Sequence, residues 1–127
     1  MVFPAVRAWE ISVTRYESWA DDGVGIVEVT GDLGPGESAA FHAAIRSAID
    51  QAQVPALVIA CSAVGRMALG PVSVIITTDQ ALRARGGRAV LASLDARIQR
   101  VLRVGGVTDI DAFPDLETAL AALREPR

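Results

Sequence analysis

The stretch that decides the fold is FHAAIRSAIDQAQVPALVIAC, residues 41–61. Its apolar side chains recur at helical spacing, and the members of this stripe are Phe41, Ala44, Ile45, Ala48, Ile49 and Ala52. The spacing predicts an amphipathic helix with one face on a core, ended by Pro55. Residues 56–61 are apolar throughout, which is typical of a strand covered on both faces. A helix followed by a fully buried strand favours an α/β fold.

Upstream of this helix, the sequence predicts two strands and a turn. Residues 9–14 alternate apolar and polar side chains, which is the pattern of a half-buried strand. Asp-Asp-Gly at 21–23 supplies a turn, and Val24–Thr30 is rich in β-branched residues. Because the connection is short, we expect the two strands to form a hairpin or to lie side by side. Residues 31–36, with three glycines and a proline, break the chain before the helix.

Downstream, helical and strand patterns alternate to the end of the chain. The predicted elements are a helix starting at Pro71, the strand Arg88–Ala92, a helix from about Asp95, a short strand within 107–113 and a helix starting at 114–115. Two glycine pairs, at 86–87 and 105–106, end the first two of these helices. The order predicts an α/β protein with an opening strand pair, then mainly parallel strands, and about four helices. We expect one domain over residues 1–127.

The composition is that of an ordinary globular domain. The chain has 127 residues, 51% of them hydrophobic but only 5% aromatic, so Ala, Val, Ile and Leu must fill the core. Its net charge is −3, which argues against non-specific nucleic-acid binding. The single cysteine, Cys61, excludes an internal disulfide. The sequence shows neither a signal peptide nor an apolar run long enough to span a membrane, so we expect a cytoplasmic protein.

Several short motifs occur in an order that is informative about the family. They are GDL at 31–33, LVI at 57–59 with SAV at 62–64, ARGGRAVL at 84–91, RIQRVLRVGG at 97–106 and FPDLETAL at 113–120. In this order they resemble the STAS domain, the family of the bacterial anti-sigma-factor antagonists, from about Gly25 to Leu123. The resemblance implies a STAS-like mixed sheet and a non-enzymatic module without a cofactor. It also implies bacterial signalling and transcription regulation, with an anti-sigma factor or GHKL-type kinase as the protein partner.

The resemblance also locates the family's regulatory loop. In that family a kinase phosphorylates the serine immediately before a glycine, after the strand that corresponds to residues 57–64. Aligned on Gly70, the acceptor position is Leu69, and the family's preceding serine and aspartate fall on Ala68 and Met67. A second acidic position of the family falls on Gly34. Because the acceptor hydroxyl and both carboxylates are missing together, phosphorylation at this position is chemically excluded.

We expect the partner to bind at this same end of the fold. The candidate contact residues are Gly34, Pro35, Arg66, Met67, Ala68, Leu69, Gly70 and Pro71. Leu69 and Met67 would give the surface an apolar centre, which suits constitutive contact rather than contact broken by phosphorylation. The following helix carries hydroxyl groups at Ser73, Thr77 and Thr78, and the sequence leaves open whether any is modified.

Other chemistry-bearing residues have plainer interpretations. His42 is the only histidine, so a Ser-His-Asp triad would need unusual convergence, and a surface position is favoured. Cys61 ends an apolar strand and is expected to act as a small hydrophobe. The glycines of residues 31–36 lack the spacing of a phosphate-binding motif and are interpreted as a turn. The sequence also shows no metal-ligand cluster.

Two basic features leave alternatives open. Arg66 near a helix start could hold an anion, although a solvated loop arginine is the simpler interpretation. Six of the twelve arginines lie between Arg83 and Arg103, with Asp95 as the only carboxylate in that interval. A solvated face is the simpler interpretation there too, against an acidic protein partner or a lipid headgroup. The resemblance implies a second functional hypothesis, because STAS-like domains also serve transporters and lipid-trafficking systems: an accessory domain that binds a small ligand or a lipid or transport complex. Homodimer formation is left open, and an enzyme is the least favoured class.

Overall fold

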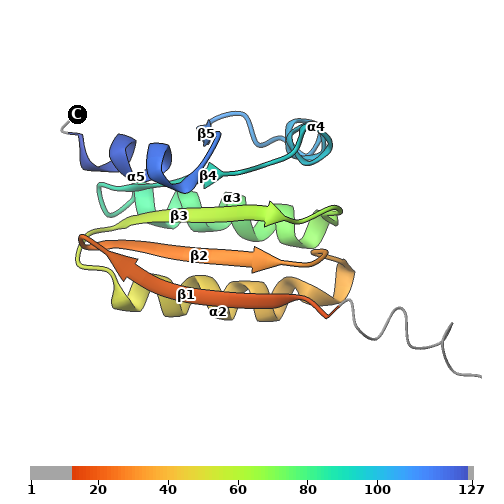
Figure 1. Cartoon of the computed structure of the whole chain (residues 1–127), viewed down its shortest axis with the longest axis horizontal. Coiled ribbons are helices and arrows are strands. Elements are labelled where there is room, and N and C mark those ends of the chain that lie inside the picture. Colours follow the sequence, from red (N-terminus) through yellow and green to blue (C-terminus); the bar gives the residue numbers. More distant parts are fainter. Residues whose placement is uncertain (1–12, 126–127) are drawn as a thin grey trace, which may run out of the picture.

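The computed structural model describes residues 13–125. The strands are β1 (Arg15–Asp21), β2 (Val24–Thr30), β3 (Ala56–Ala63), β4 (Arg88–Ala92) and β5 (Ala112–Phe113). The helices are the short 3-10 helix η1 (Pro35–Glu37) and α2 (Ser38–Gln51), α3 (Leu69–Arg83), α4 (Ala96–Val104) and α5 (Leu116–Arg124). Figure 1 shows the strands side by side in one sheet of order β1-β2-β3-β4-β5. β1 runs antiparallel to β2, and every later pair is parallel. The predicted fold class is confirmed.

The first strand differs from the sequence prediction. Of the strand expected at 9–14, residues 9–12 lie outside the described residues, and Val13 and Thr14 are not in a strand. The hairpin turn explains where β1 lies instead. Asp22 and Gly23 have φ of 53° and 84°, the left-handed pair that a tight two-residue turn requires. That turn pairs Asp21 with Val24 and so fixes the seven residues before it as the partner strand.

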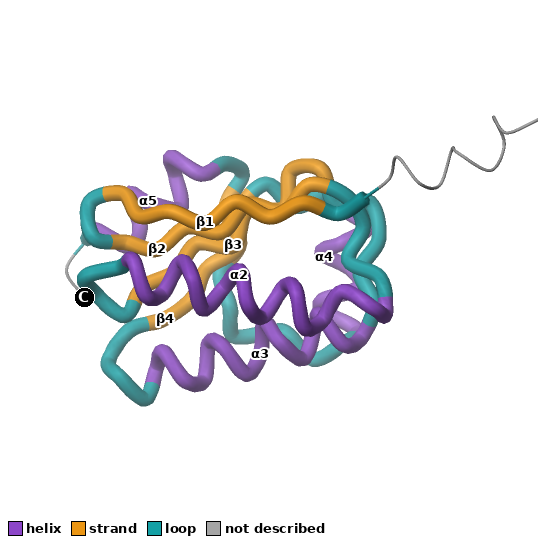
Figure 2. The backbone as a smooth tube through the Cα atoms, turned by 90° about the horizontal axis from the view of Figure 1, so that it is seen from below, coloured by secondary structure: helices purple, strands orange, loops and turns teal. Residues whose placement is uncertain are grey.

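Helices cover both faces of the sheet. Figure 2 shows α2 and α3 together on one face and α5 on the other. The larger core cluster lies under α2 and α3 and includes Phe41, Ile45 and Ile75, and α4 contributes Ile98 and Leu102 to it. The smaller cluster lies under α5 and joins Ala119 and Leu120 to residues of β2, β3 and β4. The two clusters explain why β3 is apolar along nearly its whole length, because its alternate side chains enter different cores.

The remaining elements follow the sequence prediction, with shifted ends. The strands Val24–Thr30 and Arg88–Ala92 have the predicted bounds, whereas the last strand contains only Ala112 and Phe113. Helix α3 begins at Leu69, two residues before the predicted start at Pro71. A proline is tolerated there because backbone N–H groups in the first turn of a helix have no partner within the helix.

A buried carboxylate connects α3 to β4, the strand beneath it. The side chain of Asp79 is only 6% exposed, and its Oδ1 accepts a hydrogen bond from the backbone N–H of Ala89 at 2.9 Å. Its Oδ2 accepts a bond from Nε of Arg83 at 2.6 Å. Arg83 also donates to the backbone oxygen of Asp109 at 2.7 Å, in the segment that leads to β5. Two of the six clustered arginines are therefore used inside the fold, since Arg88 pairs with Asp111 at 2.7 Å.

Candidate functional site

Two loops that are distant in sequence are joined at the carboxyl end of the parallel strands. Leu33 and Met67 form a parallel β-bridge outside the main sheet. The backbone N–H of Leu33 donates to the oxygen of Arg66 at 2.9 Å, and the N–H of Ala68 donates to the oxygen of Leu33 at 2.8 Å. We call residues 33–35 and 66–71 the paired loops. All the candidate contact residues from the sequence lie in the paired loops, so the structure brings the two predicted segments together.

The paired loops do not expose all of these residues. Pro35, Arg66, Leu69 and Gly70 are exposed, and Leu69 is 70% exposed. Gly34 and Ala68 are half-buried. At the carboxyl ends of parallel strands, exposed groups of this kind commonly form binding surfaces.

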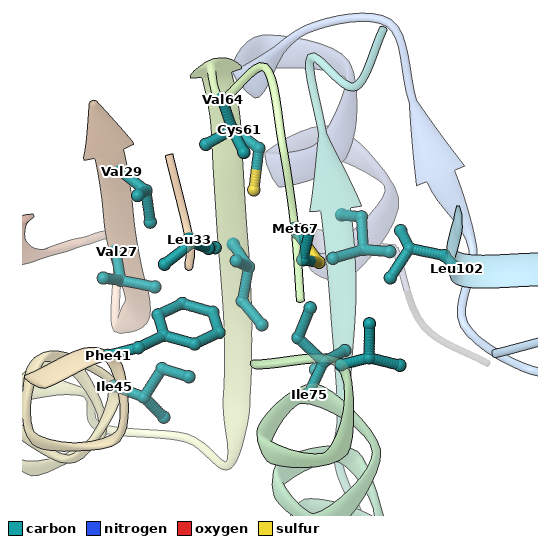
Figure 3. Packing of buried hydrophobic residues seen from close by; sticks show 14 of the residues in the cluster. Val27, Val29, Leu33, Phe41, Ile45, Cys61, Val64, Met67, Ile75 and Leu102 are labelled. Carbon is teal, nitrogen blue, oxygen red and sulfur yellow. The ribbon is translucent and has the colours of Figure 1, made fainter. Parts of the chain in front are cut away.

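Met67 and Pro71 correct the expected surface, because both are buried. Figure 3 shows Met67 among the core side chains, with Leu33 and Ile75 nearby. The reason is the bridge to Leu33, which holds residue 67 in strand-like geometry and turns its side chain inward, away from Leu69. Leu69 alone therefore supplies the exposed apolar group of this loop.

The first turns of α2 and α3 meet beside the paired loops. A Cβ atom on Gly70 would collide with the hydroxyl oxygen of Ser38, the first residue of α2. The residue before α3 is Ala68, which has no side-chain oxygen to cap the helix. Within residues 13–125, the backbone N–H groups of Leu69 and Gly70 have no hydrogen-bond acceptor, and both residues are exposed. These donors add partial positive charge next to Leu69.

The end of α4 reaches the same region, and the sequence analysis missed it. A Cβ atom on Gly105 would lie 2.9 Å from Cγ1 of Val72, so the end of α4 packs directly on the first turns of α3. Val104, the last residue of α4, is 82% exposed. The sequence did contain a signal for this residue. Val104 is an apolar residue that falls outside the buried stripe of Ile98 and Leu102 on an otherwise amphipathic helix.

Two acidic groups at this end of the sheet, Asp32 and Glu37, lie on the β2 side, whereas Asp95 follows β4 and caps the start of α4. Oδ1 of Asp32 accepts a hydrogen bond from the backbone N–H of Gly65 at 3.3 Å. Oε1 of Glu37 accepts a bond from the hydroxyl of Tyr16 at 2.7 Å. Burial, followed by this bond and the charge of Glu37, raises the pKa of Tyr16 above its ordinary value. Both carboxylates are thus engaged on the side of the site away from α4.

The other candidate residues do not form a reaction centre. Cys61 is buried in the larger core, and burial raises the pKa of its thiol to about 12, so it stays protonated and shielded. His42 is exposed on α2, beside a cavity of about 120 Å³ that Thr77 and Thr78 also line. Thr78 is buried, and the hydroxyl of Thr77 donates to the backbone oxygen of Ser73 at 2.8 Å. Ser73 and Thr77 are exposed.

The described residues contain neither a metal-ligand cluster nor a membrane-spanning helix. Among residues 13–125, no group of three or more His, Cys, Asp or Glu side chains is placed to hold a metal ion. In the same part of the chain, every helix is too short or too polar to cross a lipid bilayer.

A five-stranded mixed sheet with an exposed apolar residue at the start of α3 defines a small α/β module with a surface site rather than an enclosed one. The model of the family described as "Mlab, STAS domain" matches residues 18–124. The chain therefore belongs to the STAS domain family. A search of curated proteins found no match.

Solved structures support the same assignment. An anti-sigma factor antagonist from Mycobacterium paratuberculosis is 25% identical with a TM-score of 0.78, over 90% of this chain and 97% of that one. Unphosphorylated SpoIIAA, also an anti-sigma factor antagonist, is 18% identical with a TM-score of 0.74, over 87% of this chain and 96% of that one. The murine anion transporter Slc26a9 is 16% identical with a TM-score of 0.74, over 94% of this chain but 24% of the transporter. The latter two likenesses show the fold alone.

Proposed function

We propose that this chain is a non-enzymatic protein-interaction module of the anti-sigma-factor-antagonist kind, which binds its partner through the paired loops. The observation that carries the proposal is Leu69, an apolar residue 70% exposed at the start of α3. A leucine so exposed costs free energy in water and gains it when a partner covers it. The likeness to the mycobacterial antagonist over nearly its whole length supports a role of the antagonist kind.

The partner we propose is an anti-sigma factor or a GHKL-type kinase in the bacterial cytoplasm, and the whole chain acts as one domain. Binding does not depend on phosphorylation of the loop, because residues 64–70 contain no Ser, Thr or Asp. Contact is then constitutive and is controlled by the amounts of the two proteins. Gly34, Pro35, Arg66, Ala68 and Gly70 would surround Leu69 in the contact.

The test is affinity purification from lysate of the native host, comparing the wild type with Leu69→Asp. The matched control is Val54→Asp, since Val54 is also an exposed apolar residue (47%) but precedes β3, at the opposite end of the sheet. We expect one kinase-type or anti-sigma protein to be retained by the wild type and by Val54→Asp and to be lost with Leu69→Asp. A partner retained equally by all three proteins would contradict the proposal.

The second candidate is an accessory domain of a transport or lipid complex. The likeness to the STAS-like part of an anion transporter favours it. A cavity of about 340 Å³ lies between Val54, Gly87 and Leu123, at the end of the sheet opposite the paired loops. Native mass spectrometry of the purified protein separates the candidates, because a retained acyl chain or nucleotide would favour this second function. Recovery of a membrane transporter in the purification would favour it as well.

A further inference from the structure

Two of the four most exposed large apolar residues between 13 and 125 lie at one corner of the molecule. The four are Val13, Val54, Leu69 and Val104. Leu69 lies on α3 three residues before Val72, so the two side chains share a face of the helix. Val72 in turn contacts the position of Gly105, which follows Val104. Figure 1 shows the start of α3 and the whole of α4 at the same end of the sheet.

This corner is basic in a protein of net charge −3. Arg100 lies one helical turn before Val104 and on the same side of α4, because residues four apart are neighbours on a helix. Arg66 is exposed in the paired loops just before Leu69. Neither Arg66 nor Arg100 forms an ion pair with a residue in the range 13–125. Three of the other clustered arginines differ, since Arg83, Arg88 and Arg97 pair with Asp79, Asp111 and Asp95.

The backbone N–H donors at the start of α3 carry partial positive charge, the same sign as the arginines. These donors are the N–H groups of Leu69 and Gly70, which follow Arg66 closely in the chain. Asp32 and Glu37, the carboxylates nearest the paired loops, lie on the β2 side and are engaged in hydrogen bonds. The corner therefore presents two apolar side chains with positive groups near them, while the nearby carboxylates are Asp32 and Glu37 on the β2 side and Asp95 at the opposite end of α4. We call Arg66, Leu69, Gly70, Arg100 and Val104 the α3–α4 corner.

We propose that the α3–α4 corner binds an acidic amphipathic helix of the partner protein, with its apolar face on Leu69 and Val104 and its carboxylates toward Arg66 and Arg100. This inference rests on the proposed function and extends it in two ways. It adds α4 to the contact surface, and it defines the partner segment by charge. An amphipathic helix is the proposed occupant because its single apolar face could cover two exposed apolar residues on neighbouring helices. Charge complementarity would speed association and exclude basic surfaces.

The first test uses a defined probe. A short synthetic amphipathic helix carries leucines on one face and glutamates beside them, and its control carries lysines in place of the glutamates. Binding to the ¹⁵N-labelled full chain is followed by NMR. We expect the acidic peptide to shift the amide signals of Leu69, Gly70, Val104 and Gly105, and the lysine peptide to leave them unchanged. Equal shifts with both peptides, or no shifts at these amides, would overturn the proposal.

Variants then test the individual residues. Arg100→Glu and Val104→Asp should each weaken binding of the acidic peptide by about fivefold or more in low salt, and added salt should reduce the effect of the first. The matched controls are Arg85→Glu and Val54→Asp, both at exposed positions outside the corner, which should bind like the wild type. The amide spectrum of each variant shows that it is folded.

A membrane surface is the competing occupant, because anionic headgroups also attract arginines. Phosphatidylglycerol vesicles are mixed with the wild type and with Arg100→Glu, and sedimentation is measured. Sedimentation of the wild type that Arg100→Glu abolishes, without binding of the acidic peptide, would overturn the choice of a protein partner. Absence of sedimentation, together with peptide binding, supports it.

Binding of the variants to the natural partner distinguishes failure of the proposed function from failure of the inference about the α3–α4 corner. If a purified partner is lost with Leu69→Asp but retained at full affinity by Arg100→Glu and Val104→Asp, the proposed function stands and this inference fails. If no partner depends on Leu69, the proposed function itself fails.

Discussion

The hydroxyl oxygen of Ser38 fills the space that a Cβ atom on residue 70 would occupy. Ser38 begins α2 and Gly70 is the second residue of α3, so the two helices meet through their first turns. Gly70 is needed for this close approach rather than for a left-handed backbone, since its φ is not positive. The contact fixes the start of α3, and with it the position of Leu69.

We predict that Gly70→Ala lowers the free energy of unfolding by about 1 kcal/mol or less, because the added methyl group forces the Ser38 hydroxyl into another rotamer. Ser38→Ala in the same protein should recover most of that loss, since the remaining neighbour, Cβ of Ser38, would lie at an ordinary 3.6 Å. Urea denaturation of the wild type, both single variants and the double variant measures the coupling. A double variant as unstable as Gly70→Ala would contradict this account.

Met67 and Leu69 should respond in opposite ways to the same substitution. Met67→Asp places a carboxylate among core residues and should lower the free energy of unfolding by about 3 kcal/mol or more. Leu69→Asp places it in water and should change that free energy by about 0.5 kcal/mol or less. Thermal melts followed by circular dichroism compare the two variants. Equal destabilisation would refute the inward direction of Met67.

Asp79 should contribute far more to stability than the surface ion pairs. Asp79→Ala leaves the buried N–H of Ala89 without its acceptor and frees Arg83, so we expect a loss of about 2–4 kcal/mol. The control is Arg97→Ala, which removes an exposed pair with Asp95 at 3.7 Å and should cost about 0.5 kcal/mol or less. Chemical denaturation measures both. The prediction fails if the two losses are alike.

The buried thiol should make the fold sensitive to alkali. The pKa of Cys61 rises from its ordinary 9.0 to about 12 in the folded chain, so the folded state keeps a proton that the unfolded state loses. The stabilising contribution is therefore complete below about pH 9 and decreases as the pH rises toward 12. Cys61→Ala should flatten the fall in the free energy of unfolding above pH 9, measured by urea denaturation across pH. A slope unchanged by this variant would assign the alkaline sensitivity to other groups.

Most elements were predictable because their patterns are local. The apolar stripe from Phe41 to Ala52 predicted which face of the helix is buried, and the apolar run of β3 predicted burial on both faces of that strand. The first strand was not predictable from the alternation of apolar and polar residues. Tyr16, Ser18 and Ala20 lie on one face of β1, and these three residues mix apolar and polar side chains. Its bounds follow from the turn at Asp22 and Gly23 and from pairing with β2.

The candidate surface was predictable only as a region. The resemblance of motifs identified the loops around Gly34 and Leu69, and the structure confirms that the two loops meet. The direction of each side chain depends on the bridge between Leu33 and Met67, which no local pattern reports. Val104 became a candidate only through the packing of Gly105 on Val72.

By itself the sequence determined the α/β class, the order of the elements and the absence of a hydroxyl or carboxylate between residues 64 and 70. Each of these depends on residue type and short-range spacing, which the chain carries before it folds. Only the tertiary structure decided that Met67 points into the core, that Leu69 is left exposed, and that α4 joins α3 in one basic, apolar corner. These features arise from contacts between segments more than thirty residues apart, where burial and backbone pairing set side-chain direction.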